Sequence, residues 1–270
     1  MAMDIIDYKI YGNDMQFVEV ELDPGEAAVG EAGAMMFMED GIVMDTVFGD
    51  GSSQEKSFWG KLVGAGKRLV TGESLFTTVF MNQGAGKRKV SFAAPYPGTL
   101  IPIHLPDVGG TLICQKDSFL CAAKGVSLGI AFQRKLGVGL FGGEGFIMQR
   151  LDGDGLAFVH AGGTLYRRDL MPGETLRVDT GCIVALTQTV SYDIQYIGKL
   201  KSALFSGEGL FYAVLQGPGT VWLQSLPLSR MANRIVMAAP AIGGRSQGEG
   251  SLLGAGAAGG LLGGLLGDDE

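Results

Sequence analysis

Histidine is nearly missing from this sequence, and few other side chains could serve as metal ligands or nucleophiles. His104 and His160 are the two histidines, and the three cysteines form no C-x-x-C pair. No G-x-S-x-G elbow and no H-E-x-x-H pattern occurs. A zinc site that combines a histidine with Cys114 or Cys121 is the alternative, but no two ligands have the close spacing that zinc sites use. We therefore expect satisfied structural histidines, no catalytic residue, no metal and no cofactor.

Long apolar runs and a positively charged N-terminus are missing too. No segment reaches the ~20 apolar residues of a membrane-spanning helix. The first ten residues, MAMDIIDYKI, carry Asp4 and Asp7 where a secretory signal peptide needs positive charge. Three cysteines cannot all pair, so we expect buried thiols in a reducing compartment. These features predict a cytoplasmic protein, and peripheral contact with a membrane is compatible with them.

A strong positive charge, which nucleic-acid binding needs, is missing from the chain as a whole, because the formal net charge is −7. The bases are nevertheless concentrated in one zone, which comprises Lys56, Lys61, Lys67, Arg68, Lys87, Arg88 and Lys89. This zone could meet anionic lipid or RNA. Residues 1–50 hold twelve acidic side chains that could balance it. We favour a balanced, solvated face and do not expect nucleic acid as a partner.

Glycine, by contrast, is abundant, and one glycine-rich stretch resembles a nucleotide-binding motif. Gly137–Gly142, GVGLFG, fits the dinucleotide fingerprint G-x-G-x-x-G, which works when a strand feeds a glycine turn that opens a helix. A lone match is weak evidence in a chain with 45 glycines. GAGKR, at 64–68 and 84–88, lacks the other residues of a phosphate-binding loop, and Asp152-Gly-Asp154-Gly is too short for a calcium loop.

An internal repeat explains the glycine-rich stretch. At an offset of 64 residues, 15 positions between 111 and 155 are identical to their counterparts, among them Gly143-Glu144-Gly145 and Gly207-Glu208-Gly209. The counterpart of GVGLFG is KSALFS, at 201–206, which keeps none of the fingerprint glycines. We therefore predict a repeated structural unit and no nucleotide site at Gly137–Gly142.

A third copy lies near the N-terminus. Leu22-Asp-Pro-Gly-Glu26 matches Leu170-Met-Pro-Gly-Glu174, and Gly72-Glu73-Ser-Leu-Phe76 matches Gly207-Glu208-Gly-Leu-Phe211. This copy is about a dozen residues longer than the others, and Ser52–Glu55 there is a candidate capping box for a helix over 56–69.

The repeats predict an all-β fold. Short apolar strands separated by Gly and Pro turns indicate β-sandwich or barrel-like units, here three in pseudo-threefold arrangement over about 4–97, 98–162 and 163–226. In each unit we expect a hairpin over the G-x-G turn, as in FIMQRL-DGDG-LAFVHA. We expect one triplicated β domain over 1–240, with a short helix at Ser229–Met237, and a glycine-rich tail over 241–270.

The triplicated L-x-P-G-E, Gly-Glu-x-Leu-Phe and G-x-G pattern resembles the mitochondrial biogenesis family named for altered inheritance of mitochondria, over about residues 4–240. The resemblance implies a fold like that of the tryptophan RNA-binding attenuation protein, with three similar β units in one chain. It implies no catalytic residues, and fold alone does not carry over RNA or tryptophan binding.

One set of carboxylates recurs at the same place in each repeat, namely Glu73, Glu144 and Glu208. A pseudo-threefold axis could bring them together, where they would hold a cation or raise one another's pKa values. The favoured interpretation is that each accepts backbone N–H groups within its own repeat.

These features predict a non-enzymatic β scaffold that acts through a protein partner, self-association or a membrane surface. The alternatives are binding of an anionic ligand or RNA by the basic zone, and binding of a small molecule or metal in a β cavity. The tail, Leu252–Gly267, has two G-x-x-x-G registers that could pack helices in lipid. In water its glycines disfavour a helix, so we expect a flexible tail on which any membrane association depends.

Overall fold

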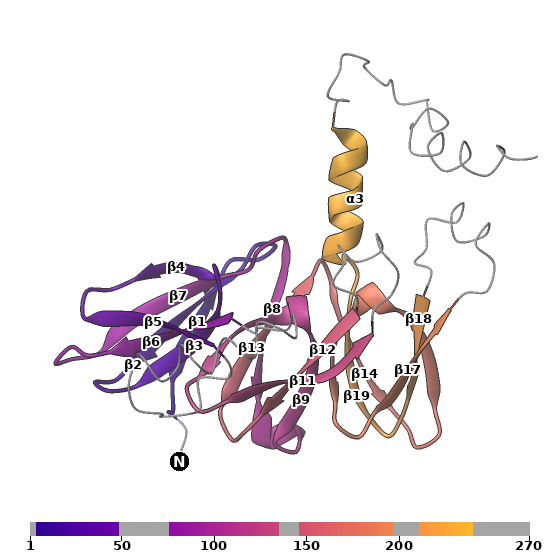
Figure 1. Ribbon diagram of the computed structural model, residues 1–270, viewed down its shortest axis with the longest axis horizontal. Helices are drawn as coiled ribbons and strands as arrows, with labels where there is room; N and C mark the ends of the chain where they lie inside the picture. Colours follow the sequence, from indigo (N-terminus) through magenta and orange to yellow (C-terminus); the bar gives the residue numbers. More distant parts are fainter. Residues whose placement is uncertain (1–3, 49–75, 135–145, 197–210, 240–270) are drawn as a thin grey trace, which may run out of the picture. The chain divides into compact units, whose positions relative to one another are not determined.

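The computed structural model describes residues 4–48, 76–134, 146–196 and 211–239 (Figure 1). The chain divides into two compact units, Met1–Ser229 and Arg230–Glu270. All strands of the described residues lie in the first unit, which confirms the predicted all-β fold.

Six strands recur in the same order in each repeat. We label their positions a to f in chain order, so that a is the first strand of a repeat and f is the last. A seventh strand, β1 (Asp7–Tyr11), precedes the first repeat. The first repeat consists of β2 (Phe17–Leu22), β3 (Ala27–Glu31), β4 (Met35–Met38), β5 (Ile42–Phe48), β6 (Phe76–Asn82) and β7 (Arg88–Ala93). The second consists of β8 (Gly98–His104), β9 (Thr111–Gln115), β10 (Phe119–Ala123), β11 (Ser127–Arg134), β12 (Phe146–Asp152) and β13 (Leu156–Gly162). The third consists of β14 (Leu165–Leu170), β15 (Thr175–Asp179), β16 (Ile183–Thr187), β17 (Ser191–Tyr196), β18 (Phe211–Gln216) and β19 (Gly219–Gln224). Short 3-10 turns lie at Leu105–Val108, Lys116–Ser118 and Thr180–Cys182.

Strand pairing is also the same in all three repeats. Strand f lies between a and c, and strand e lies between b and d, always antiparallel. The register between c and f shifts at one equivalent place in each repeat, at Met35/Phe37, Phe119/Cys121 and Ile183/Ala185. A bulge that recurs at the same position in each repeat is a regular feature of the fold. The structure therefore shows that the sequence repeat is a repeat of one strand topology.

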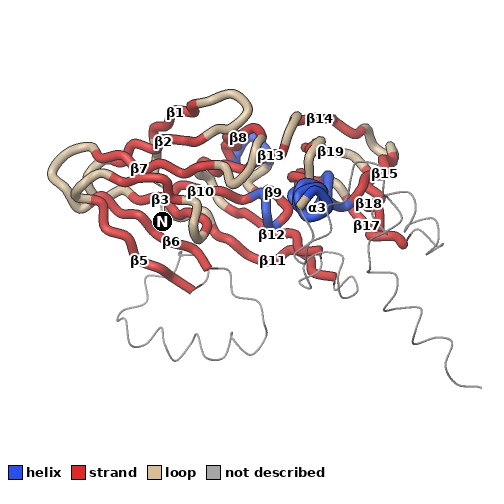
Figure 2. Tube along the Cα trace, turned by 90° about the horizontal axis from the view of Figure 1, so that it is seen from above, coloured by secondary structure: helices blue, strands red, loops and turns tan. Residues whose placement is uncertain are grey.

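Successive repeats are joined because strand b of one pairs with strand c of the next. β3 pairs with β10, and β9 pairs with β16. Four sheets result: sheet 1 (β1-β2-β7-β4), sheet 2 (β5-β6-β3-β10-β13-β8), sheet 3 (β11-β12-β9-β16-β19-β14) and sheet 4 (β15-β18-β17). Figure 2 shows the strands of sheet 2 side by side although they come from two repeats. The pairings thus link the first repeat to the second and the second to the third.

The predicted hairpins over the G-x-G turns are wrong, although the strands themselves are present. β12 belongs to sheet 3 and β13 to sheet 2, and β6/β7 and β18/β19 are divided between sheets in the same way. The true hairpins are β5–β6, β11–β12 and β17–β18, which enclose the variable connections. A glycine turn lets the chain reverse, but it does not decide whether the next strand enters the same sheet.

Three hydrophobic cores lie between successive sheets, so the two inner sheets are buried on both faces. Ala157 and Val159 of β13 pack in the core between sheets 2 and 3, whereas Phe158 packs in the core between sheets 1 and 2. Ile113 of β9 likewise belongs to the core between sheets 3 and 4. Because successive side chains of a strand point to opposite faces, doubly buried strands read as continuous apolar runs.

The L-x-P-G-E motif is a turn that carries the chain from one sheet to the next. In the first repeat the carboxylate of Glu26 accepts the backbone N–H of Asp23 at 2.8 Å, and in the third Glu174 accepts that of Met171 at 2.9 Å. The motif glycines have positive φ, +89° at Gly25, a conformation that glycine adopts without strain. The conserved glutamate of this motif therefore has a structural role.

The second unit begins within a helix, α3 (Leu228–Ala238), which confirms the helix expected at Ser229–Met237. None of its residues is buried, and Ile235, Val236 and Met237 are more than half exposed. Among the described residues, no helix has the length and apolarity needed to cross a bilayer.

Candidate functional site

Most of the residues singled out in the sequence lie outside the described residues. Glu73, Glu144 and Glu208 precede strand e of their repeats, in the connections from β5, β11 and β17. Their mutual geometry stays a prediction, as does the helix over 56–69. Gly137–Gly142 also lies outside, but it is followed by strand β12 and not by the helix that a dinucleotide fingerprint requires.

The basic zone is described only at Lys87, Arg88 and Lys89, since Lys56, Lys61, Lys67 and Arg68 lie outside the described residues. The Lys87 ammonium lies 2.7 Å from a Glu21 carboxylate oxygen and 3.5 Å from one of Asp7. Lys89 lies 2.8 Å from Glu19, and Arg88 donates to the carbonyl of Asp40. Hydrogen bonds to Glu21 and Glu19 raise the pKa values of Lys87 and Lys89. This part of the zone is balanced by acidic residues, mostly of β1 and β2.

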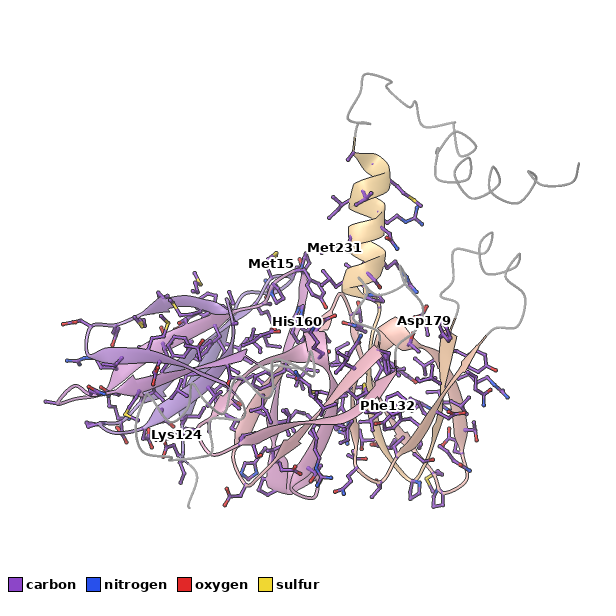
Figure 3. All side chains as sticks on the ribbon, in the orientation of Figure 1. Met15, Lys124, Phe132, His160, Asp179 and Met231 are labelled. Carbon is purple, nitrogen blue, oxygen red and sulfur yellow. The ribbon has the colours of Figure 1, made fainter. Side chains whose placement is uncertain are left out.

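The two histidines lie in different environments. His104 is half exposed, with Nδ1 3.2 Å from Asp107. His160, labelled in Figure 3, is buried, and its ring lies edge-on to that of Tyr96. Its ring nitrogens form no hydrogen bond of ordinary geometry with the described residues, although the Tyr96 backbone favours the protonated ring. Burial lowers the pKa of His160 to about 4, so the ring is neutral at pH 7. Among the described residues, no three His, Cys, Asp or Glu side chains group as metal ligands. The expectation that both histidines are hydrogen-bonded is met at His104, by Asp107, and only in part at His160.

Two of the three cysteines are buried thiols, as expected, whereas the third is partly exposed. Cys114 and Cys121 are buried, and Cys182 is partly exposed. Burial raises the pKa of Cys114 to about 12 and that of Cys121 well above its ordinary value. Both thiols therefore stay protonated at neutral pH, as expected of buried structural cysteines.

Glu31, at the end of β3, is a partly buried carboxyl that the sequence did not single out. Burial, and to a lesser degree the charge of Asp117, raises its pKa to about 7. The pKa of Tyr96 is raised to about 12, mainly by burial. A perturbed carboxyl can mark a functional site. Here it lies where the first two repeats join, and the charges of Asp117 and Lys116 act on it in opposite directions.

The most unusual surface of the first unit is apolar. Five large apolar side chains of β4 and β5 are 38–55% exposed, and we call them the β4–β5 apolar surface: Met36, Phe37, Met38, Val43 and Met44. The two strands are joined by a tight turn in which the N–H of Ile42 donates to the carbonyl of Glu39. β4 is the edge of sheet 1, and β5 is the edge of sheet 2. Exposed apolar side chains gathered in one place mark contact surfaces more often than isolated ones do.

The equivalent strands of the other repeats show why this exposure is unusual. The c–f registers align Met36 and Phe37 with Leu120 and Cys121 in the second repeat, which are each 1% exposed. In the third repeat the equivalents, Val184 and Ala185, are fully buried. There, the strand is covered because strand b of the preceding repeat pairs with it. No described strand b pairs with the edge of β4, so strand c of the first repeat is left exposed.

Sequence reasoning identified MMFM as an apolar strand but did not predict that it is exposed. A signal was present, because the terminal units of a repeat array usually have a polar outer face. MMFM is as apolar as FLCAA and IVALT, its counterparts. An apolar strand c in a terminal repeat therefore indicates a surface that is meant to be covered.

Comparison with known proteins agrees with the repeat architecture. The family model described as mitochondrial biogenesis AIM24 matches residues 8–226. An uncharacterised protein of Streptococcus pyogenes serotype M6 is 30% identical over 227 residues, which are 82% of this chain and 86% of that protein. The crystal structure of a Streptococcus pyogenes protein has a TM-score of 0.68 at 22% identity and covers 87% of this chain and 100% of the other. The last likeness is one of fold.

Proposed function

This chain belongs to the mitochondrial biogenesis AIM24 family, and from that premise we propose that it is a non-enzymatic β scaffold whose β4–β5 apolar surface binds a partner. The observation that carries the proposal is the exposure of Met36, Phe37 and Met38 on an edge strand whose counterparts are buried. Removing apolar area from water contributes about 25 cal/mol per Å², so covering these side chains favours association.

The chemistry of the surface suits binding by contact. Three of its five members are methionines, whose flexible, polarisable side chains adapt to different partner surfaces. The side chains stand on paired strands, so little backbone order has to be gained on binding. A non-enzymatic role is supported by the protonated buried thiols and the neutral, enclosed His160.

A photo-crosslinking experiment tests the proposal. A photoreactive phenylalanine analogue at position 37 is expected to form covalent adducts in cells that natively make the protein. The matched control carries the same analogue at Met15, which is 56% exposed but lies outside the β4–β5 apolar surface. Mass spectrometry identifies what is attached at each position.

Two outcomes distinguish a surface that binds a partner from one that is only exposed to solvent. Specific adducts at position 37 that decrease when Met36 and Met38 are both changed to Glu support the scaffold role. Adducts no more abundant at position 37 than at position 15 would contradict it.

A further inference from the structure

Two sheet edges of the first unit lack a partner strand among the described residues. They are formed by the two kinds of strand, b and c, that pair with each other at the junctions between repeats. Strand b pairs with the next strand c twice within the chain, as β3 with β10 and β9 with β16. The third strand b, β15, borders only β18, and the first strand c, β4, borders only β7 among the described strands. An open edge presents unpaired backbone groups and is a template for strand addition.

We propose that β15 of one copy pairs antiparallel with β4 of a second copy, so that the repeat series continues from molecule to molecule. The inference rests on the proposed function, because it names a second copy of this chain as the partner of the β4–β5 apolar surface. Sheet 4 of one copy and sheet 1 of the next would form a single sheet with seven strands.

The two internal junctions predict the register of this pairing. Cys121 lies opposite Gly30 at the first junction, and Ala185 lies opposite Cys114 at the second. The c–f registers align Phe37 with Cys121 and Ala185.

In each repeat strand b pairs with strand e, and the strand e residues opposite Gly30, Cys114 and Val178 occupy equivalent positions. Val178 therefore occupies the same position of strand b as Gly30 and Cys114. We therefore expect Phe37 opposite Val178, Met38 opposite Arg177 and Glu39 opposite Leu176.

Packing at the internal junctions supports the same arrangement. Leu120 and Cys121 belong to the core of the preceding repeat, and so do Val184 and Ala185. Met36 and Phe37 at these positions would join the core between sheets 3 and 4 of the other copy, to which Val178 already belongs. The exposure of the two side chains, 55% and 39%, would then fall toward the 0–1% of their counterparts.

The third repeat likewise exposes a side chain whose counterpart in the second repeat is buried. Tyr166 of β14 occupies the position of Ile101 of β8, since each lies opposite an equivalent residue of strand f. Ile101 is 8% exposed and packs in a core with Trp222 of the following repeat, whereas Tyr166 is 55% exposed. No repeat follows the third within the chain, so a second copy would supply the missing cover.

The contact is heterologous, because two different edges meet. Head-to-tail contacts of this kind close into a ring when the rotation between copies permits and extend as a filament when it does not. Charge does not oppose the pairing, since β4 contains no charged side chain from Met35 to Met38.

Covalent crosslinking tests the register. Residues directly opposite in an antiparallel pair have Cβ atoms about 4.5–5.5 Å apart, which a short bis-thiol reagent spans. A full-length chain with Met38→Cys and Arg177→Cys, in which Cys182→Ser removes the partly exposed native thiol, is expected to give covalent dimers and higher multimers. The matched control combines Met38→Cys with Thr175→Cys, which lies two residues away on the same strand, and should give several-fold less.

Sedimentation measures the association without cysteines. The wild-type protein should gain mass with concentration, and Phe37→Glu should weaken the association by roughly tenfold or more. Met15→Glu, an apolar-to-acidic change at a more exposed position outside both edges, should leave it unchanged. A wild-type protein that stays monomeric at all concentrations, or equal crosslinking in the two cysteine pairs, would overturn the proposal.

The two proposals fail differently. If the analogue at position 37 forms adducts with another protein or with lipid but never with β15, the second-copy partner is wrong and the scaffold role stands. If it forms no specific adduct, the scaffold role itself is wrong.

Discussion

At the residue scale, burial shifts the pKa values of two polar side chains, Glu31 and His160, toward their uncharged forms. Glu31 ends β3, one of the two strands that pair across this junction, and burial is the first cause of its raised pKa. His160, on β13 beside Tyr96, is kept neutral by the same cause. Desolvation disfavours the charged form of any group, so the carboxyl pKa rises and the imidazole pKa falls.

The raised pKa of Glu31 predicts a pH dependence of stability. Its pKa is about 7 in the folded state and 4.5 as the ordinary value, so between these pH values the folded protein binds a proton that the unfolded chain has lost. The contribution of this group to stability should therefore be fully present below pH 4.5 and fall as pH rises to 7, by about 1–3 kcal/mol. Glu31→Gln should remove this slope in denaturant unfolding at several pH values. The control is Asp154→Asn, an exposed turn residue that should keep the wild-type slope; equal slopes in all three proteins would refute the assignment.

Phe158 tests the double burial of the inner sheets. Its ring is fully buried in the core between sheets 1 and 2, on a strand whose other face packs in the next core. Phe158→Ala should cost about 3–5 kcal/mol of unfolding free energy, because it leaves a cavity that rigid strands cannot fill. Phe37→Ala, at a partly exposed phenylalanine, should cost less than half as much in dilute protein. Similar losses in equilibrium denaturation of the two variants would contradict the burial pattern.

At the element scale, each turn or connection decides which sheet the next strand enters. The L-x-P-G-E turns and the G-x-G turns both move the chain between sheets, while the connections from d to e close the hairpins. The helix α3 differs from the strands, since it buries none of its residues.

The C-terminal segment is expected to be dispensable for the β fold. Deleting residues 243–270 should leave the melting temperature nearly unchanged, because the strands all lie in the other compact unit. Flotation with anionic vesicles checks the second half of the hypothesis, that any membrane association depends on this segment. A truncated protein that unfolds, or one that floats as well as the full chain, would be evidence against it.

At the scale of the whole molecule, the repeats share sheets instead of standing as separate domains. Every inner sheet combines strands b, d and e of one repeat with a, c and f of the next. The second repeat thus contributes half of sheet 2 and half of sheet 3, and both halves need a neighbour to cover their second face.

A single repeat should therefore not fold alone. A chain limited to residues 98–162 is expected to lack a cooperative thermal transition, because cutting out the repeat exposes both outer faces and both junction strands. Circular dichroism against temperature measures this, with residues 1–229 as the folded control. A sharp transition in the isolated repeat would show that the shared sheets are not required.

Local features of this protein were determined by its sequence. The threefold repeat, the strands, the glycine turns and the helix before Pro240 follow from apolar alternation and turn residues, which act over a few positions. The tertiary structure decided what depends on strands far apart in the chain. It placed β12 and β13 in different sheets and set Lys87 and Lys89 against Glu21 and Glu19. It also left Met36, Phe37 and Met38 exposed while their counterparts are buried, because no described strand pairs with that edge of β4.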